Sequence, residues 1–267
     1  MECEGYVRLD QLLIERGLAG GRGEAQHLIR EGRVKLGDRV LSKPGQPLDP
    51  AAKLTVEHRE ATYASRGALK LAAALEALPI PVEGRVAMDV GASTGGFTDV
   101  LLRAGAARVY AIDVGYGQLA WTLRTDPRVV VLDRTNIRHL ERLPESPALA
   151  TIDVAFISLD LVLPAVQRLL AEDGQVICLI KPQFEVGRGQ VGKGGVVRDP
   201  KAHAGVIARV LAGAQAGGWA VGGLLASPIT GPAGNREFLA WLLRTPASPV
   251  FDIDNAIAEV TRGRDDI

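Results

Sequence analysis

Short apolar runs, each followed by an acid, recur from residue 85 onward and constrain the fold more than any other feature. The runs RVAMD, RVYAID, RVVVLD and ATIDV place Asp89, Asp113, Asp133 and Asp153 at separations of 24, 20 and 20 residues. That spacing fits one strand and one helix per repeat, and such alternation builds a parallel sheet covered by helices. We therefore predict an α/β domain whose four acids lie in register along one sheet edge, where open α/β sheets bind ligands.

A glycine-rich turn, DVGASTGGFTDVLL, follows the first of these runs. Gly91, Gly95 and Gly96 permit tight turning and a close backbone approach to a ligand, and a helix that begins near Gly96 has free amides in its first turn. With Asp113 one strand and helix later, the arrangement suits S-adenosylmethionine. One carboxylate would hold the ribose hydroxyls, another would lie near the adenine amine, and the loop would surround the methionine part.

Two other glycine motifs are weaker signals. GYGQLA at 115–120 satisfies the G-x-G-x-x-A dinucleotide pattern, but Asp113 would face the pyrophosphate and the following helix is short. GRGQVGKG at 187–194 has the spacing of a phosphate loop, but a glycine replaces the hydroxyl residue that contacts magnesium, and no strand directly precedes the motif. We interpret it as a mobile loop whose cations, continued by Arg198 and Lys201, contact phosphates.

Lys181 stands at the carboxyl end of the apolar run QVICLI and is followed by a proline. A hydrated cation gains nothing from packing there. Its strand follows the one that ends near Asp153, so we expect the two charges on one sheet edge. Lys70, on the polar face of an expected helix whose apolar face includes Leu69, and Glu237, ahead of a final apolar segment, are further candidates. For both, a solubilising or helix-dipole role is the alternative.

The amino-terminal part has a different pattern. YVRLDQLLIERGLAG and GRGEAQHLIREGRVKL predict short helices that end at glycine, and the sequence up to residue 58 predicts short strands joined by Gly-Asp and Pro-Gly turns. We expect a helix pair facing a small curled sheet in residues 1–58, a short tether at 59–64, and the larger domain at 65–267. Six basic and three acidic residues lie between Arg22 and Lys43, an excess that a solvated helix face would also explain.

Overall charge and composition limit the possible partners and the compartment. The 31 basic and 31 acidic residues cancel, so a nucleic-acid surface must be local. Cys3 and Cys178 lie far apart, and the histidines lack ligand spacing, so we expect no disulfide framework and no metal site. The sequence has no signal-peptide pattern and no apolar run long enough to cross a bilayer. We expect a cytoplasmic monomer without membrane contact, with Trp121, Trp219 and Trp241 in core or sheet packing.

The segments RLDQLL, GRGEAQHLIREGRVKLGDRV and KPGQPL resemble the S4-like RNA-binding domain, also called the αL motif. Gly21-Arg22 stands where the family usually has Ser-Arg, and Gly37-Asp38 replaces Asn-Gly, but neither change removes a basic side chain. The resemblance implies a grip on structured RNA by the basic residues Arg8, Arg22, Arg30, Arg33, Lys35, Arg39 and Lys43.

Further blocks resemble the FtsJ-type ribose methyltransferases: SRGALKL, MDVGASTGGFTD, AIDVGYGQL, LDRTNIR, DVAFISL, LIKPQFE, VGKGGVVRD and GNREFL. With the amino-terminal part, residues 6–244 are similar to the TlyA family, described both as haemolysins and as ribosomal RNA 2′-O-methyltransferases. The resemblance implies a Rossmann-like class I S-adenosylmethionine-dependent methyltransferase domain after a small α+β S4-like domain. It also implies a catalytic tetrad of Lys70, Asp153, Lys181 and Glu237.

The same resemblance implies where the donor and the RNA bind. Donor contacts are expected from Ser65, Arg66, Gly67, Asp89, Gly91, Ala92, Ser93, Gly95, Gly96, Phe97, Asp113, Val114, Asp133 and Asn136. Asp133 stands where glutamate is commoner, which should preserve the adenine contact. Phe184 is expected to contact a flipped nucleotide, and Arg188 and Lys193 to contact RNA.

The resemblance also implies the reaction: methylation of a cytidine ribose in large-subunit ribosomal RNA and, in some members, of a second in small-subunit RNA, within ribosomal subunits. A ribose hydroxyl is a very weak acid, so catalysis reduces largely to alignment and proton removal. We expect Asp153 to orient Lys181, while Lys70 and Glu237 position the ribose. The rival hypothesis is a ribosome-binding or assembly protein with a vestigial donor site. A pore-forming function has no sequence support, and the tail after residue 244 is expected to form a terminal helix.

Overall fold

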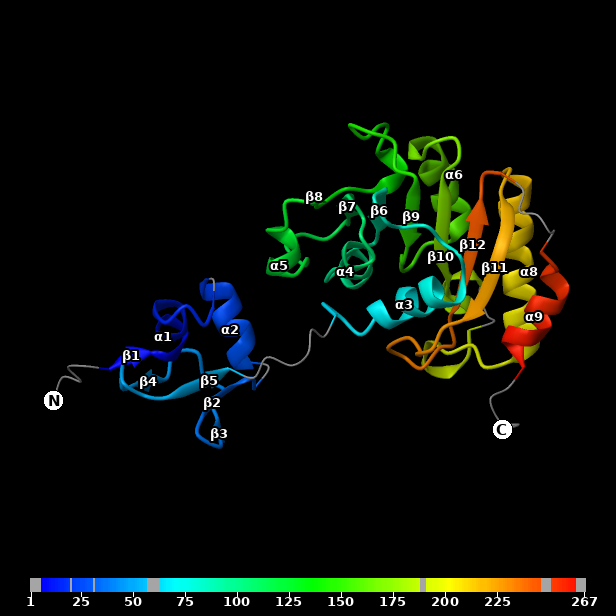
Figure 1. Ribbon diagram of the computed structural model, residues 1–267. Helices are drawn as coiled ribbons and strands as arrows, with labels where there is room; N and C mark the ends of the chain where they lie inside the picture. Colours follow the sequence, from blue (N-terminus) through cyan, green and yellow to red (C-terminus); the bar gives the residue numbers. More distant parts are fainter. Residues whose placement is uncertain are drawn as a thin grey trace. The chain divides into compact units, whose positions relative to one another are not determined.

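The computed structural model describes residues 6–19, 21–30, 32–56, 63–187, 191–245 and 251–262. The chain divides into two compact units, Met1–Thr62 and Tyr63–Ile267 (Figure 1). Tyr63 and Ala64, which the sequence suggested as part of a tether, belong to the second unit and contact its other residues. The Ala64 amide donates to Asp99 Oδ2 at 2.9 Å, and the Arg103 guanidinium lies 4.7 Å from the centre of the Tyr63 ring.

The first unit packs a helix pair against short antiparallel strands, as predicted. Its described elements are β1 (Val7–Arg8), α1 (Leu9–Glu15), α2 (Arg22–Arg30), β2 (Val34–Leu36), β3 (Arg39–Val40), β4 (Pro47–Leu48) and β5 (Leu54–Val56). One sheet has the order β3-β2-β5, and β1 pairs with β4. Beyond α2, Gly32 has φ +69°, a left-handed conformation that glycine adopts without steric cost. Leu9, Leu13 and Ile29 are fully buried between the helices and the strands.

The second unit is built on a mostly parallel sheet, which confirms the predicted fold class. Within the described residues this sheet has seven strands, in the order β11-β12-β10-β9-β6-β7-β8. They are β6 (Val86–Val90), β7 (Arg108–Ile112), β8 (Val129–Leu132), β9 (Leu149–Ile152), β10 (Gln175–Ile180), β11 (Ala220–Ala226) and β12 (Phe238–Leu243). Strands β6 to β10 pair in parallel, whereas β12 runs antiparallel to both of its neighbours.

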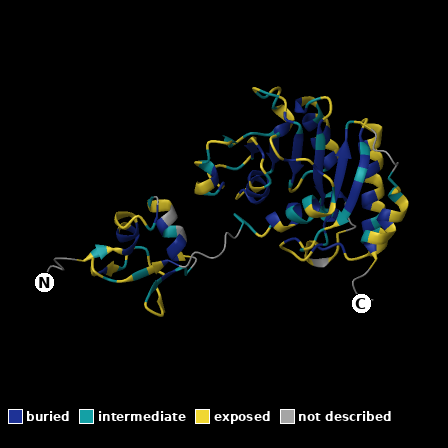
Figure 2. Ribbon diagram, in the orientation of Figure 1, coloured by how far each residue is buried: buried dark blue, intermediate teal, exposed yellow. Residues whose placement is uncertain are grey.

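Helices cover both faces of this sheet, and its strands are buried between them (Figure 2). On one face pack α3 (Ala68–Ala77), α4 (Gly96–Arg103) and α5 (Trp121–Arg124); on the other pack α6 (Leu159–Leu169), α8 (Pro200–Ala216) and α9 (Ile253–Thr261). The short helices η1 (Ile137–His139), α7 (Pro182–Glu185) and η2 (Lys193–Gly195) lie in connections. The expected terminal helix is α9. In the part of the chain that the structure describes, no helix is long and apolar enough to span a bilayer.

The orientation of α3 differs from the prediction. Lys70 is 6% exposed, whereas Leu69 is 45% exposed. The buried face is formed by Ala68, Leu71 and Ala74, because small side chains allow the helix to approach its neighbours closely. The sequence interpretation gave more weight to large apolar residues than to alanine, and so assigned the lysine to the wrong face.

Two further predictions about side-chain placement were wrong. Trp121 is 57% exposed, whereas Trp219 and Trp241 are buried as expected. The acids are also not all in register. Asp113, Asp133 and Asp153 directly follow strands β7, β8 and β9, but Asp89 lies inside β6, paired with Thr151 of β9, because the strand continues to Val90 before the chain turns.

Asp89 is fully buried, and two hydroxyl groups satisfy its carboxylate. Thr98 Oγ1 donates to Oδ2 at 2.7 Å, and Thr151 Oγ1 donates to Oδ1 at 3.0 Å. Burial disfavours the charged form more strongly than these hydrogen bonds favour it, and raises the pKa of Asp89 from 3.8 to about 6. Between these values the folded chain binds more protons than the unfolded chain. The contribution of Asp89 to stability is therefore present below about pH 4 and is lost as the pH rises through about 6.

We predict that Asp89→Asn stabilises the protein at pH 8 by up to ~3 kcal/mol, because one unit of pKa corresponds to about 1.4 kcal/mol, and much less at pH 4.5. Urea unfolding at both pH values measures this difference. Asp173→Asn, which neutralises an exposed acid of the same unit, is the matched control and should show no such pH dependence. A variant at Asp89 that is less stable than wild type at pH 8 would contradict the assignment.

Candidate active site

Four charged side chains from separate parts of the chain converge at the carboxyl edge of the parallel strands. Lys70 comes from α3, Asp153 follows β9, Lys181 follows β10, and Glu237 precedes β12. Because β12 is antiparallel to β10, with Ile180 opposite Phe238, the residue after β10 and the residue before β12 lie at the same end of the sheet. The topology thus explains how residues more than 160 positions apart meet.

The four charges form a row of alternating sign. Lys70 Nζ lies 2.6 Å from Glu237 Oε2 and 3.8 Å from Asp153 Oδ2, and Lys181 Nζ lies 2.5 Å from Asp153 Oδ1. Side-chain exposure is 1% for Glu237 and 8% for Lys70, but 13% for Lys181 and 21% for Asp153. The Lys70–Glu237 pair is therefore the enclosed end of the row, and the Lys181–Asp153 pair is the end that a substrate can reach.

Two glycines allow the backbone to pass close to these carboxylate residues. A Cβ atom at Gly231 would lie 2.6 Å from Glu237 Oε1. Gly91 has φ +85°, and a Cβ atom there would collide with the backbone carbonyl of Asp153. At Gly91 the glycine-rich turn therefore rests directly against the strand end that carries Asp153, a contact with the protein itself that the sequence analysis did not predict.

The turn after β6 and the acids after β7 and β8 lie beside this row in the sheet order. Asp113 accepts the Ser93 amide at 2.8 Å and the Gly115 amide at 2.7 Å, which joins two loops. The adjacent Val114 is 70% exposed. Asp133 pairs with Arg124 at 2.8 Å, and this hydrogen bond lowers the pKa of Asp133. The sequence interpretation anticipated both acids at this edge but not the arginine.

Several residues expected to contact a donor have structural partners. Ser65 packs against Gly96, and Arg66 donates to the Thr230 carbonyl at 2.8 Å. Asn136 caps η1 by accepting the Arg138 amide at 3.1 Å. Ala92 and Phe97 are buried in the core, and Asp89 lies beneath the turn. Gly67 precedes α3. Ser93 and Val114 are exposed, Asp113 accepts two backbone amides at the same edge, and Asp89 and Phe97 are buried beneath the loop.

The basic residues of the first unit are mostly at its surface. Arg8, Arg22, Arg30, Arg39 and Lys43 are exposed, and Arg33 and Lys35 are partly exposed. In the second unit, Arg188 and the side chain of Lys193 lie outside the described residues. Phe184 is half-buried on α7, and its ring centre lies 5.9 Å from Lys181 Nζ.

Phe156 is a residue that the sequence interpretation missed. It is 91% exposed and has φ +62°, a conformation that is uncommon for residues other than glycine. Its ring centre lies 4.8 Å from that of Phe184 at an interplanar angle of 50°. The pair, of which Phe156 is exposed and Phe184 half-buried, offers a surface beside Lys181 on which a planar group can stack. The sequence showed a phenylalanine in the short segment DVAFIS, but it gave no sign of the left-handed backbone.

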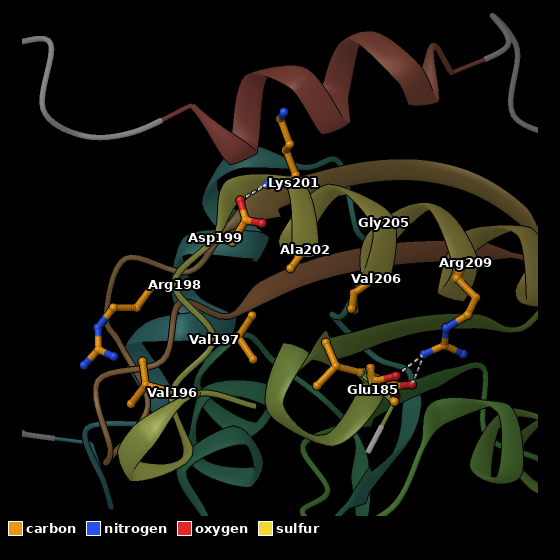
Figure 3. A pocket seen from close by; sticks show the side chains of 13 residues that line it. Glu185, Val196, Val197, Arg198, Asp199, Lys201, Ala202, Gly205, Val206 and Arg209 are labelled. Atoms are coloured by element: carbon orange, nitrogen blue, oxygen red, sulfur yellow. Dashed lines mark hydrogen bonds and ion pairs between the residues drawn. The ribbon is translucent and has the colours of Figure 1, made fainter. Parts of the chain in front are cut away.

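Glu185, the last residue of LIKPQFE, was also missed as a site residue. It is buried and accepts Ser158 Oγ at 2.8 Å and the Leu159 amide at 2.8 Å. It also accepts Arg209 Nη2 at 3.0 Å (Figure 3). Ser158 and Leu159 end the loop that carries Asp153 and Phe156. The carboxylate of Glu185 therefore ties that loop to the segment that carries Lys181 and Phe184.

A groove of about 800 Å³ lies between α7 and the start of α8 (Figure 3). Glu185, Arg198, Lys201 and Arg209 are among the residues that line it, whereas the charged row described above does not. The groove begins four residues after Lys181 and carries the two cations, Arg198 and Lys201, that were expected to contact phosphates. It is thus a neighbour of the charged row rather than the donor site.

Comparisons with known proteins agree with this geometry. The FtsJ-like methyltransferase family matches residues 63–244, and the S4 domain family matches residues 7–54. The 16S/23S rRNA (cytidine-2′-O)-methyltransferase TlyA of Mycobacterium tuberculosis is 50% identical over 239 residues, covering 88% of this chain and 89% of that protein. Hemolysin A of Brachyspira hyodysenteriae is 37% identical over 238 residues, covering 88% of this chain and 98% of that protein.

A solved structure extends the agreement to three dimensions. The protein described as "Putative hemolysin from Streptococcus thermophilus" has a TM-score of 0.71 and 41% identity, and the match covers 96% of both chains. The two family matches fall on the two units, one on each. The chain therefore belongs to the TlyA family, in which an S4 domain precedes an FtsJ-like methyltransferase domain.

Proposed function

We propose that this protein transfers a methyl group from S-adenosylmethionine to the ribose 2′-oxygen of a cytidine in ribosomal RNA. The observation that carries the proposal is the row of alternating charges that ends in the accessible Lys181–Asp153 pair. The target class comes from relatives named as rRNA (cytidine-2′-O)-methyltransferases. The rival, an assembly factor with a vestigial donor site, would not need to keep two lysines out of water.

The residues of the turn fit the donor. Ser93 is exposed, Asp113 supplies a carboxylate suited to a diol, and exposed Val114 offers an apolar contact for a flat ring. When bound, S-adenosylmethionine supplies a methyl group on a sulfonium, which is an excellent leaving group. The protein is then left to align the ribose hydroxyl and to remove its proton.

The charged row assigns these tasks to separate residues. Lys181 is at the accessible end, and we assign it the acceptance of the hydroxyl proton, a role that a lysine fulfils only in its neutral form. Asp153 holds the Lys181 amine in place at 2.5 Å and, through Lys70, connects it to the enclosed end of the row. Lys70 and Glu237 form a 2.6 Å pair that fixes the floor of the site. Their fixed charges align the substrate rather than exchange protons with it.

RNA is held by both units in this proposal. The S4 domain contributes the basic residues on its surface, and the second unit contributes the aromatic pair Phe156–Phe184 for the target base. Arg198 and Lys201 contact the flanking backbone, and Arg188 and Lys193 are kept as further proposed RNA contacts. We place the reaction in the cytoplasm on ribosomal subunits, where two binding regions can read shape. A monomeric state and a metal-independent reaction remain predictions.

Lys181→Ala is expected to lower methyl transfer at least about 100-fold, the usual contribution of a general base, while donor affinity by calorimetry stays within about twofold. Lys181→Arg keeps the charge beside Asp153 but cannot accept a proton, so it should be equally inactive. Lys53→Ala, which removes an exposed lysine of the first unit, is the control for the loss of one positive charge. Wild-type turnover by either Lys181 variant would refute the assignment.

Asp113→Asn should weaken donor binding about tenfold or more, since hydrogen bonds to a charged group contribute about 1.5–3 kcal/mol. Calorimetric titration with S-adenosylmethionine measures the change. Asp126→Asn, an acid paired with Arg128 on the turn before β8, is the matched control and should bind the donor normally. Equal donor affinity for wild type and Asp113→Asn would remove that carboxylate from the site.

Phe184→Ala and Phe156→Ala should each raise KM for RNA about 5- to 150-fold, the range expected for loss of base stacking worth about 1–3 kcal/mol. Donor affinity should not change. Leu161→Ala, which truncates another exposed apolar residue, is the control and should leave KM unchanged. If both phenylalanine variants keep the wild-type KM, the aromatic pair does not hold the base.

A further inference from the structure

The first unit contains a buried acid among the residues expected to bind RNA. Asp10, in the first turn of α1, is 2% exposed. Arg8 donates to it through two atoms, Nε to Oδ1 at 2.9 Å and Nη2 to Oδ2 at 2.8 Å. Such a two-point pair fixes the plane of the guanidinium as well as its position. RNA is an anion, so a buried carboxylate in the surface expected to bind it requires an explanation.

Asp10 also reaches the second helix. Its Oδ2 accepts Gln26 Nε2 at 3.2 Å and lies 3.7 Å from Arg22 Nε, both on α2. The Gln11 amide donates to Oδ1 at 3.1 Å. One carboxylate thus connects β1, α1 and the start of α2. The hydrogen bond from Arg8 is the largest of the effects that lower the pKa of Asp10 to about 2, so the carboxylate is charged at every physiological pH.

The two arginines are exposed although their carboxylate is not. Side-chain exposure is 50% for Arg8 and 71% for Arg22, against 2% for Asp10. Arg8 is confined on a further side by Gly45, where a Cβ atom would lie 3.1 Å from Arg8 Nη1. Each guanidinium has five N–H donors, and Asp10 uses only some of them. The remaining donors of both groups can face a ligand, while one buried carboxylate hydrogen-bonds the Arg8 guanidinium and lies at ion-pair distance from that of Arg22.

A helix-dipole partner is the simpler explanation for an acid in a first helical turn. It accounts for the hydrogen bond from Gln11 but not for the burial or for the two arginines from different elements. A long cationic side chain loses much of its rotamer freedom when it is fixed. If an internal carboxylate fixes the side chain during folding, less conformational entropy is lost when a phosphate binds.

We propose that Asp10 is a positioning residue that holds Arg8 and Arg22 as a preorganised pair for RNA phosphate groups, so that an acid promotes the binding of an anion. This inference rests on the proposed function, because it takes RNA as the ligand of the S4 domain. It predicts the direction in which RNA affinity changes when the acid is neutralised. A bystander acid repels RNA, so its neutralisation strengthens binding, whereas neutralising a positioning acid weakens binding.

The test compares two variants of the full chain that remove one negative charge from the same unit. Asp10→Asn loses the positioning carboxylate, and Asp38→Asn loses an exposed acid in the turn between β2 and β3. Binding to transcribed 23S ribosomal RNA is measured by filter retention at a fixed salt concentration, without donor. We expect Asp10→Asn to bind about 5- to 10-fold more weakly, and Asp38→Asn to bind as tightly as wild type or tighter. Equal or tighter binding by Asp10→Asn overturns the inference.

A second pair of variants separates positioning from misfolding. In a chain that carries Arg8→Gln and Arg22→Gln, the substitution Asp10→Asn should change RNA affinity less than about twofold, because the groups it positions are gone. A similar loss in both backgrounds would indicate a folding defect and overturn the inference.

Methyl transfer to ribosomal subunits distinguishes this inference from the proposed function. Asp10→Asn should raise KM for RNA and leave kcat near the wild-type value, since Asp10 does not touch the reacting atoms. If wild type neither binds RNA nor transfers methyl groups, the proposed function fails and the inference fails with it. If wild type does both and Asp10→Asn behaves as wild type, only the inference fails.

Discussion

The Lys70–Glu237 ion pair is the interaction on which the rest of the site depends. A lysine and a glutamate that are almost fully enclosed are stable only together, since removal of either leaves an uncompensated buried charge at a cost of about 3–5 kcal/mol. The pair fixes α3 against the start of β12. Asp153 approaches Lys70 from the strand on the other side of β10, and Lys181 completes the row. The accessible lysine is thus oriented by charges that cannot move independently.

Sheet topology and loop anchoring place these groups. Strand β12 lies between β10 and β11 and runs antiparallel to both, which brings Glu237 to the sheet edge where Lys181 emerges. Glu185 joins the two segments that carry Asp153 and Lys181. The same principle operates in the first unit, where Asp10 joins two helices and two arginines. In both units a buried carboxylate holds cations or aromatic groups in position.

Much of the fold was predictable because its signals are local. The repeat of apolar runs gave the strands, the glycine turn gave the start of α4, and Lys181 at a strand end gave its pairing with Asp153. The errors arise where tertiary packing decides. Ala68 and Ala74 turned Lys70 inward, and the extra length of β6 buried Asp89. The exposure of Trp121 and the left-handed backbone of Phe156 depend on neighbours distant in sequence, so no local pattern reported them.

The central claim is that the charged row activates a sugar oxygen, and the chemical identity of the product tests it most directly. Purified protein would be incubated with donor labelled in the methyl group and ribosomal subunits that lack the modification. The RNA would then be digested to nucleosides and separated by chromatography with mass detection. The account predicts label in 2′-O-methylcytidine, with the methyl group on the ribose fragment. Label on a base would contradict it, and so would the absence of label both with ribosomal subunits and with free ribosomal RNA as the substrate.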